Sequence, residues 1–401
     1  MSAMTEGALF TRPTAELARL GRAGMILGAV GLGLAAIGFA TVDRAAFLQS
    51  YLIAFIFWIG ITLGSTAVLM VQHLTNGKWG LVSRRILEAS TRTLPLMALL
   101  FLPIWFNLPT LYKWARPEAA SDPIIQQKAA YLNPSFFGLR AVIFFAVWGG
   151  LIFLLNKWSR EQDERPAQPK GPIDRRFRML SGPGLVLYVV TVTFMSVDWV
   201  MSLDPHWYST IFGVLTIGGQ GLATMAFTII VLASLVRFAP MSGIADAGVF
   251  HDLGKLMFAF VMLWAYFSVS QLLIIWSANL PEEIPFYLER LHGPWYPISV
   301  TLLLGQFALP FLLLLSQSLK RNPRTVRTVA IWILAMRVVD ITWTIGPVFR
   351  HEGSGLSWLD FAVVLAMGGL WLGLFFRTLA GRALVPARDP YFKEAMAHGG
   401  H

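Results

Sequence analysis

Two charged side chains inside one long apolar stretch give the first indication of chemistry. Arg337 and Asp340 lie three positions apart, so on a helix they share one face and can form an ion pair. A charge at the centre of a bilayer costs about 2.5–3.5 kcal/mol on insertion scales, so both groups should face protein or water. One interpretation is a buried salt bridge that fixes helix packing. The other is a stop on a proton path, and the two remain open.

Further polar residues fall near the ends of apolar stretches that we assign to the outer side of a membrane. They indicate one outer polar cluster, made of Arg140, Asp198, Asp204, His206, Arg337, Asp340 and Asp360. The alternative is a set of independent helix caps and pairs. Asp360 fits that alternative best, because an acidic residue in the first turn of a helix suits the helix dipole.

A second polar group is expected at the cytoplasmic ends of the helices. Glu88 precedes Arg92 by four positions, which is the favoured order for a helical ion pair. His73 ends the second apolar stretch. Three more residues open the seventh stretch in a similar way: His251, Asp252 and Lys255. Solvation of helix ends is one interpretation of this group, and a cytoplasmic proton entrance is the other.

Several cofactor classes lack the residues that would hold them. The chain has no cysteine, which removes iron–sulfur ligation, thiolate metal sites and covalent haem attachment. None of the seven histidines lies in the middle of an apolar stretch: 73, 206, 251, 292, 351, 398 and 401. We therefore expect this chain to bind no haem and no metal. The glycine-rich run 218–221 follows no strand, so it indicates helix packing rather than nucleotide binding.

The overall composition is that of a membrane protein. Hydrophobic residues make up 56% of the 401 positions, charged residues only 13%, and the mean hydropathy is +0.60. A soluble domain carries roughly 25% charged residues. The net charge of +10 could suggest nucleic acid, but the basic residues stand in short loops between apolar runs, which is typical of membrane topology.

Ten apolar runs are long enough to cross a bilayer as helices, since a span needs about 20 residues. They cover 23–41, 47–72, 89–109, 134–156, 180–202, 208–236, 254–279, 295–319, 327–348 and 357–379. Because lipid offers no hydrogen bonds to the backbone, we predict an all-α integral membrane protein. The spacing of Gly24 and Gly28 indicates close packing of the first helix on a partner.

The basic residues predict the orientation. With ten alternating spans, 23 Lys and Arg fall on the side of both termini and 6 on the other, which places both termini in the cytoplasm. We expect a cytoplasmic N-terminal segment over 1–22, without a cleavable signal pattern, a membrane domain over 23–379 and a cytoplasmic tail over 380–401. The polar loop 157–179 is predicted to be a mobile connector.

Two stretches resemble a known family. Residues 196–213 read SVDWVMSLDPHWYSTIFG, and residues 265–288 read AYFSVSQLLIIWSANLPEEIPFYL. Both look like the F subunit (ActF) of bacterial alternative complex III, within the wider polysulfide-reductase/NrfD-like membrane subunit family. The resemblance covers about residues 20 to 390. It implies a fold of two four-helix bundles, helices 2–5 and 6–9, with flanking helices.

The resemblance also implies a role in the bacterial inner membrane. Such a chain would belong to a quinol:cytochrome c (electron acceptor) oxidoreductase complex, with menaquinol or ubiquinol as the electron donor. Its partners would be a sister NrfD-like membrane subunit, an iron–sulfur subunit and multihaem cytochrome c subunits, which would hold the haem c and iron–sulfur clusters. The sister subunit is the better candidate for the quinol site, so this chain would be non-catalytic or quinone-associated.

These observations lead to one hypothesis and two alternatives. The hypothesis is a scaffold that conducts protons through two polar half-paths. The cytoplasmic half would use His73, Glu88 and Arg92, and the outer half would use Asp198, Arg337, Asp340, His206 and Arg140. One alternative is a stand-alone secondary transporter, which ten helices, Pro310 and buried Asp and Arg residues would fit. The other is a purely structural membrane anchor.

Overall fold

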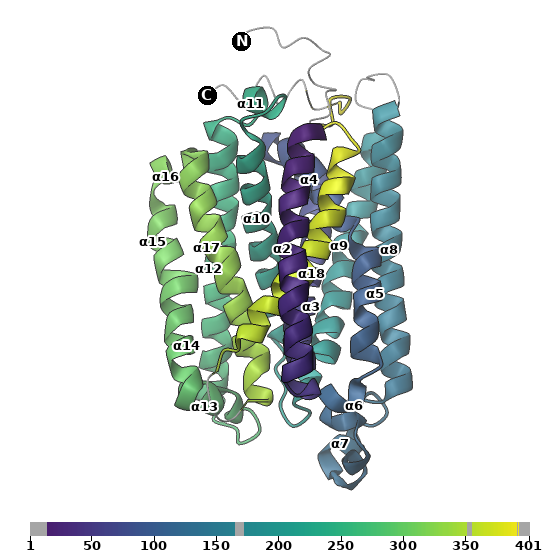
Figure 1. The fold of residues 1–401 in the computed structure, drawn as a ribbon, viewed down its shortest axis with the longest axis vertical. Helices are drawn as coiled ribbons and strands as arrows, with labels where there is room; N and C mark the ends of the chain where they lie inside the picture. Colours follow the sequence, from purple (N-terminus) through teal and green to yellow (C-terminus); the bar gives the residue numbers. More distant parts are fainter. Residues whose placement is uncertain (1–13, 165–171, 351–354, 391, 393–401) are drawn as a thin grey trace.

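The computed structural model describes residues 14–164, 172–350, 355–390 and 392. Within these residues the chain is all α-helical, and ten helices are long and apolar enough to cross a membrane. The protein is therefore a multi-pass membrane protein of the predicted class (Figure 1). The main helices are α2 (Thr14–Thr41), α3 (Arg44–Thr75), α4 (Lys78–Thr91), α5 (Leu94–Trp105), α8 (Pro134–Glu164), α9 (Pro172–Trp199), α10 (Phe212–Leu235), α12 (Ala247–Ala278), α14 (Tyr296–Thr301), the π-helix η5 (Leu302–Ala308), α15 (Leu309–Leu315), α17 (Pro323–Ile345) and α18 (Trp358–Ala380).

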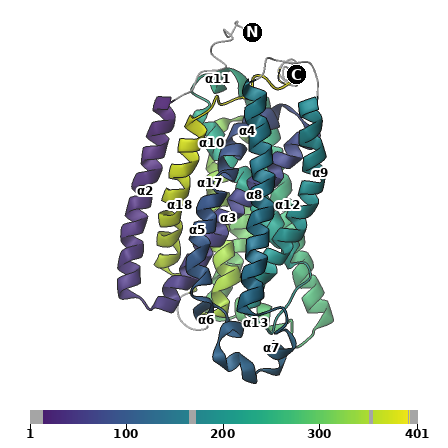
Figure 2. The same ribbon diagram turned by 90° about the vertical axis from the view of Figure 1, so that its right-hand side faces the viewer.

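Short helices complete the described residues at both ends of the bundle (Figure 1). They are α6 (Leu108–Leu111), η1 (Lys113–Ala115), η2 (Pro117–Ser121), α7 (Pro123–Gln127), η3 (Met201–Leu203), α11 (Met241–Ile244), α13 (Pro285–Leu291), η4 (Gly293–Trp295), α16 (Gln317–Arg321) and η6 (Gly346–Val348). Helices α6, α7 and α13 lie at the end opposite to the start of α2 and the end of α18 (Figures 1 and 2).

The helices pack as two bundles of four spans. The first contains α3, the α4–α5 pair, α8 and α9, and the second contains α10, α12, the span built from α14, η5 and α15, and α17. Helices α3 and α10 pack against each other and join the bundles, with further contacts from α9 to α10 and from α3 to α17. This arrangement confirms the predicted two-bundle fold, and it makes α3, most of whose residues are buried, the centre of the molecule.

Helices α2 and α18 form a pair that flanks the bundles, as Figure 2 shows. A Cβ atom added to Gly28 would lie 2.4 Å from the Cα of Gly369, so the two backbones touch there. A Cβ at Gly24 would lie 3.1 Å from the Cβ of Leu372. Small residues allow this close approach, which replaces the hydrophobic effect as the source of helix association in lipid. The packing predicted from Gly24 and Gly28 is confirmed.

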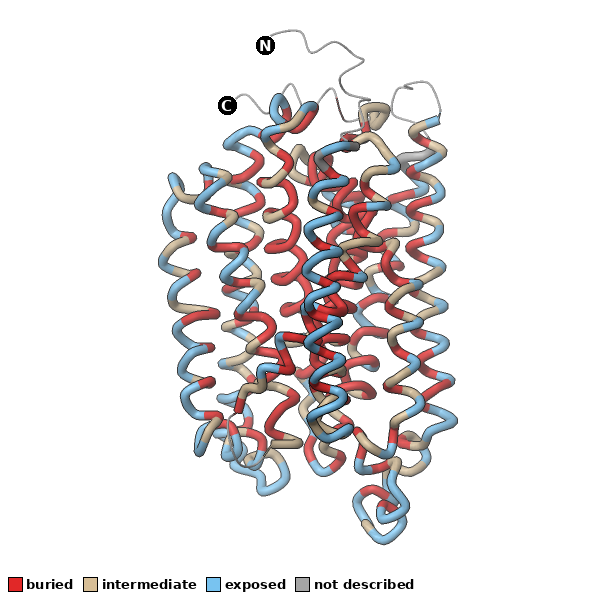
Figure 3. Tube along the Cα trace, viewed as in Figure 1, coloured by how far each residue is buried: buried red, intermediate tan, exposed pale blue. Residues whose placement is uncertain are grey.

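Burial follows the pattern of a membrane protein. Buried residues line the interior of the bundles, while many large apolar side chains on α2, α8, α12 and η5 are exposed (Figure 3). In water such an apolar surface would be unfavourable, whereas lipid tails solvate it.

The third span differs from its prediction. It begins at Lys78 rather than at residue 89, and it breaks between Thr91 and Leu94 before continuing as α5. Pro95 stands in the first turn of α5, where its missing N–H is tolerated, but it could not continue α4. The break places the polar first half of the span, with Glu88, on a short helix of its own.

The predicted connector 157–179 is also mostly wrong. Helix α8 continues to Glu164 and α9 begins at Pro172, so both helices extend past the membrane boundary assumed from hydropathy. The remaining residues 165–171, with two of the connector's prolines, lie outside the described residues. At the N-terminus, α2 already begins at Thr14, and the rest of the predicted segment 1–22 lies outside them too.

The eighth span contains a π-helix that ends just before Pro310. Proline cannot donate to the carbonyl of Gln306 four residues earlier, and its ring would clash with it in a regular α-helix. The chain widens over η5 before α15 begins, and the freed carbonyl of Gly305 accepts a hydrogen bond from Trp332 Nε1 at 2.7 Å. A π-helix inside a span often marks a functional site.

Candidate functional site

The second bundle encloses a large cavity of about 710 Å³. Its walls come from α10, α12, η5 and α17, with α13 at one end and residues of α3 and α9 on the side of the first bundle. The lining is almost entirely apolar and aromatic, with Trp264, Phe286, Trp343 and Phe307 among its members. A cavity of this size and chemistry is typical of small-molecule sites.

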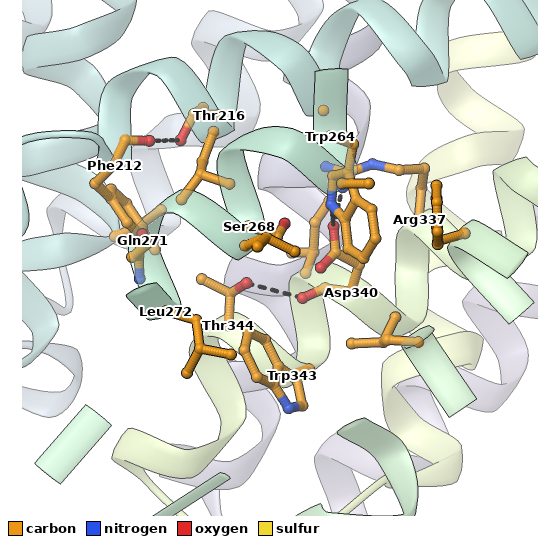
Figure 4. A pocket seen from close by; sticks show the side chains of 18 of the residues that line it. Phe212, Thr216, Trp264, Ser268, Gln271, Leu272, Arg337, Asp340, Trp343 and Thr344 are labelled. Carbon is orange, nitrogen blue, oxygen red and sulfur yellow. Dashed lines mark hydrogen bonds and ion pairs between the residues drawn. The ribbon is translucent and has the colours of Figure 1, made fainter. Parts of the chain in front are cut away.

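The predicted pair Arg337–Asp340 lines this cavity (Figure 4). The Arg337 guanidinium forms an ion pair with Asp340 Oδ2, which also accepts a hydrogen bond of 3.0 Å from Trp264 Nε1. Both charged side chains are buried. The expected pairing is confirmed, and it leaves the site without a net charge.

Space for the guanidinium comes from the glycine run of α10. A Cβ atom at Gly219 would lie 2.2 Å from Arg337 Nη2. The neighbouring Gln220 accepts a hydrogen bond of 2.7 Å from the Tyr188 hydroxyl. The packing notch predicted over 218–221 therefore receives a charged group.

Two buried polar atoms of the lining have no hydrogen-bond partner among the described residues. They are Oε1 of Gln271 and Nε of Arg337. Figure 4 places Gln271 on one side of the cavity and Arg337, Asp340 and Trp264 on the other. An unpartnered buried polar atom is costly, so these atoms indicate that a ligand or water completes them.

The cavity is partly open at the surface of the bundle. Its lining includes Tyr266 and Val269 of α12 and Leu303 of η5, all of which are exposed. A lipid-soluble molecule could therefore enter between α12 and η5 without crossing water.

Arg290, which was not among the predicted site residues, lies at the end of the cavity that α13 closes. Its buried guanidinium donates to the carbonyl oxygens of Phe286 at 2.7 Å, Thr344 at 2.7 Å and Trp343 at 3.2 Å. It also lies 3.5 Å from the centre of the Phe286 ring. Burial lowers the pKa of Arg290 to about 9, which leaves it charged at neutral pH. The residue ties α13 to the end of α17.

The second predicted pair, Arg140 and Asp198, lies in the first bundle. Arg140 Nε donates to Asp198 Oδ2 at 2.6 Å. The rings of Tyr131 and Phe136 cover the guanidinium at 3.8 and 4.4 Å. Oδ1 of Asp198 has no partner among the described residues, and the carboxylate is fully buried.

The single outer cluster predicted from the sequence is wrong. His206 Nε2 instead contacts Asp122 Oδ2 at 2.8 Å, and Asp204 lies 3.8 Å from its other ring nitrogen. Ser357 is the N-cap of α18, and the Asp360 carboxylate accepts a hydrogen bond from its backbone N–H. Asp360 also pairs with Arg350 at 2.7 Å. The seven residues thus form four separate sites, because each finds a nearer partner that hydropathy does not reveal.

At the end of the bundle where α2 starts and α18 ends, Glu88 is the centre of a buried network (Figure 1). Its carboxylate contacts Arg84 at 2.9 Å, Arg85 at 2.7 Å, Arg382 at 3.1 Å and Ser159 at 2.7 Å. The predicted pair with Arg92 is wrong: α4 ends at Thr91, and no ion pair between Glu88 and Arg92 forms within the described chain.

The other residues that we predicted for a cytoplasmic proton entrance have no hydrogen bond or ion pair with this network within the described part of the chain. His73 is buried and stacks on Phe177 at 4.2 Å, and its Nε2 has no partner among the described residues. Asp252 and Lys255 form an exposed pair at 3.5 Å, as expected for helix-end solvation. The described part of the predicted tail, with Arg382 and Asp389, instead packs into the network: Asp389 contacts Arg84 at 2.7 Å.

No protein-family model matches this chain, and no curated protein matches its sequence. Within the described residues no group of three or more His, Cys, Asp or Glu side chains is placed to hold a metal. His351, His398 and His401 lie outside these residues. The features that could carry chemistry are the Glu88 network, the Arg140–Asp198 pair and the cavity with Arg337 and Asp340.

Proposed function

We propose that this chain is a membrane subunit of a quinol-oxidising electron-transfer complex, in which it scaffolds partner subunits and conducts protons. The two stretches at 196–213 and 265–288 support the family. The observation that carries the proposal is the buried Arg337–Asp340 pair in the wall of a partly open cavity. An anchor would have no need of either feature.

The ion pair supplies a means of holding and releasing a proton. A carboxylate beside a guanidinium has a low proton affinity, and it gains affinity when the guanidinium moves away. Arg337 lines the cavity and its Nε has no hydrogen-bond partner among the described residues, so a bound ligand or a movement of α17 would be able to change its position. Asp340 would then take up a proton while Trp264 Nε1 keeps its hydrogen bond to Oδ2 of Asp340.

The two polar half-paths are assigned to opposite ends of the protein. Glu88, with Arg92 and His73 nearby in sequence, would serve the cytoplasmic half. Asp198 with Arg140, and His206 in the outer loops, would serve the outer half beside Asp340. The start of α2 and the end of α18 lie at the same end as the Glu88 helix α4 (Figure 1). With the basic loops there, this end would face the cytoplasm of a bacterial inner membrane.

The cavity favours the quinone-associated form of this role. Gln271 lies on one side and Arg337 and Asp340 lie on the other, with the hydroxyl groups of Ser268 and Thr344 and apolar and aromatic side chains between them (Figure 4). Because Arg337 and Asp340 neutralise each other, an uncharged ligand suits it better than an ion. A quinol ring, with an oxygen on each of two opposite edges and a hydrocarbon tail, has matching chemistry. Electron transfer itself would belong to the iron–sulfur and haem c groups of the partner subunits.

The first experiment is mild-detergent purification through a tag on this chain, with a visible spectrum and mass spectrometry of the proteins that follow it. We expect a c-type haem spectrum, an iron–sulfur subunit and a second membrane subunit. A colourless single protein would reject the proposal.

Proton conduction is tested in the purified complex with Asp340→Asn and Asp198→Asn. Both should lower proton uptake coupled to quinol oxidation, while Glu118→Gln, on an exposed outer loop, serves as the control. Equal uptake in all three variants and the parent would leave only the scaffold role.

The quinol site is tested by labelling with a photoreactive 1,4-quinol, kept reduced, that carries a short alkyl tail, because its hydroxyl can donate to Oε1 of Gln271. We expect saturable labelling of peptides from α12 and η5, which Gln271→Leu weakens about tenfold through the lost hydrogen bond. Gln72→Leu is a matched control, because Gln72 is equally buried and also has an unpartnered Oε1, but does not line the cavity. Equal labelling of both variants would exclude the cavity as the site.

A second candidate function is a stand-alone secondary transporter. The cavity favours it, since transporters bind substrates between helices near the middle of the membrane, beside broken helices such as the one at η5. Purification without redox partners, together with substrate-dependent uptake into vesicles, would select this function.

A further inference from the structure

A second and much smaller cavity lies inside the Glu88 network. Its volume is about 10 Å³, and its lining includes Arg85, Glu88, Arg92, Asn156 and Arg382. Thus α4, α8 and the segment that follows α18 all contribute to it. A space of this volume accommodates about one water molecule and nothing larger.

Three buried polar atoms of this lining have no hydrogen-bond partner among the described residues. They are Nε of Arg85, Nη2 of Arg382 and Oδ1 of Asn156. Two of them are donors and one is an acceptor. Buried polar groups in proteins are nearly always paired with protein or ordered water, so three unpartnered atoms around one small space indicate a missing molecule.

We propose that this cavity holds one ordered water molecule, which accepts hydrogen bonds from Arg85 and Arg382 and donates one to Asn156. A water molecule has two acceptor sites and two donors, so it satisfies all three atoms. Its second hydrogen is left for Glu88, whose carboxylate lines the same space.

The nearby positive charges do not favour an anion instead. Oδ1 of Asn156 needs a hydrogen-bond donor, which a halide ion cannot supply. Glu88 already brings a negative charge into the cavity and is held by Arg84, Arg85 and Arg382. A second negative charge beside it would be repelled, and the volume is too small for phosphate.

The water joins the carboxylate network of Glu88 to the side chain of Asn156. Asn156 Nδ2 also donates to Thr91 Oγ1 at 3.1 Å, at the last residue of α4 before the break in the span. A second link between Glu88 and Asn156 runs through the backbone, because Thr91 Oγ1 donates to the carbonyl oxygen of Glu88 at 2.8 Å. Asn156 is therefore a positioning residue that holds the water beside Glu88. The water site stands on geometry alone, whereas a role for Asn156 in proton entry rests on the proposed function.

Two variants separate the water from the packing around it. Asn156→Leu removes the acceptor while keeping the side-chain size. Ala89→Val adds methyl groups to a buried residue of the lining and fills the space without changing a charged group. Asn156→Ser is the conservative variant, because its hydroxyl can still hydrogen-bond the water and leaves room for a second one.

The test uses the purified complex in lipid nanodiscs. A cryo-EM map at a resolution that shows waters should contain a peak within hydrogen-bond distance of Arg85, Asn156 and Arg382, and the peak should vanish in Ala89→Val. Initial proton uptake should fall about tenfold in Asn156→Leu and Ala89→Val and recover in Asn156→Ser. An empty cavity in the parent map would overturn the water site.

The remaining outcomes bear on separate claims. A water peak with equal proton uptake in every variant would overturn the positioning role of Asn156. A water peak in a chain that purifies without redox partners would count against the proposed function and would confirm the water site.

Discussion

The guanidinium of Arg337 occupies the space that a side chain at position 219 would fill. A Cβ atom on Gly219 would lie 2.2 Å from Nη2 and 2.7 Å from Cζ of Arg337. The glycine of α10 and the ion pair of α17 are therefore one structural unit. Any side chain at position 219 must move a buried charge away from its partner Asp340.

Gly219→Ala should consequently displace Arg337 and weaken its pairing with Asp340. We expect a loss of about 1–3 kcal/mol in stability, as for overpacking of a core, although alanine favours a helix by itself. The midpoint of thermal unfolding, followed by fluorescence-detected size-exclusion chromatography, measures this effect.

Gly150→Ala is the matched control, because a Cβ at Gly150 would meet nothing within 4 Å on the exposed face of α8. This variant should unfold at the parent temperature or slightly above it. Equal behaviour of the two variants would show that Arg337 moves aside at no cost, and that Gly219 does not define its position.

A second prediction concerns the charge of Glu88. Three guanidinium groups contact its buried carboxylate, and Glu88→Gln would leave them with less compensation. Removal of one partner from a buried ion pair costs about 3–5 kcal/mol, and the contacts of Arg84 with Asp389 and of Arg85 with Asp163 should place this variant near the lower limit. Thermal unfolding of the purified chain again measures the loss.

The double variant Glu88→Gln with Arg382→Gln tests whether charge is the cause. Because it removes one cation together with the anion, it should be more stable than Glu88→Gln alone. If the double variant were the less stable of the two, the effect would come from lost packing rather than from uncompensated charge.

Local spacing explains which parts of the site could be predicted. Arg337 and Asp340 share one helix face, so their pairing follows from three positions of separation. Arg84 and Arg92 are both four positions from Glu88, so spacing alone allows either ion pair. The predicted partner was Arg92, because nothing in the hydropathy shows that α4 ends at Thr91. Helix number and type were equally accessible, since ten apolar runs fix them.

Contacts across the fold could not be predicted in the same way. Arg382 reaches Glu88 from 294 positions away, and Asp122 reaches His206 from 84. The walls of the large cavity come mainly from α10, α12, η5 and α17, so the cavity appears only when these helices pack together. A single sequence contains no signal for either kind of proximity.

A third prediction concerns the helix pair α2–α18. The backbones touch at Gly28 and Gly369, so a side chain at position 28 cannot be relieved by a change of rotamer. Gly28→Val should separate the two helices, lower the thermal midpoint and expose α2 to added protease. Gly33→Val on the same helix is the control, since a Cβ there would meet nothing within 4 Å. Comparable loss in both variants would mean that valine disfavours the helix itself and that the contact is unimportant.

The last prediction concerns the ion pair that joins the two bundles at the start of α4 and of α12. Lys78, at the start of α4, contacts Asp246 Oδ2 at 2.6 Å, and Oδ1 of Asp246 caps α12 by accepting from Val249 N at 3.0 Å. Burial alone would raise the pKa of Asp246, but Lys78 and the backbone N–H groups outweigh it and hold the pKa below its usual value.

A lowered carboxyl pKa stabilises the folded state at every pH above the unfolded value of about 3.9, and this stability is lost as the pH falls through the folded value. Asp246→Asn keeps the helix cap but removes the charge, since asparagine caps helices as well as aspartate. It should lower stability by less than about 1 kcal/mol at pH 7, because the pair is partly exposed. Thermal midpoints of parent and variant, measured from pH 7 down to pH 3, should converge below about pH 4.

Asp252→Asn, in the exposed pair with Lys255, should match the parent throughout. A constant difference between Asp246→Asn and the parent at all pH values would show that the variant acts through the cap and not through the charge.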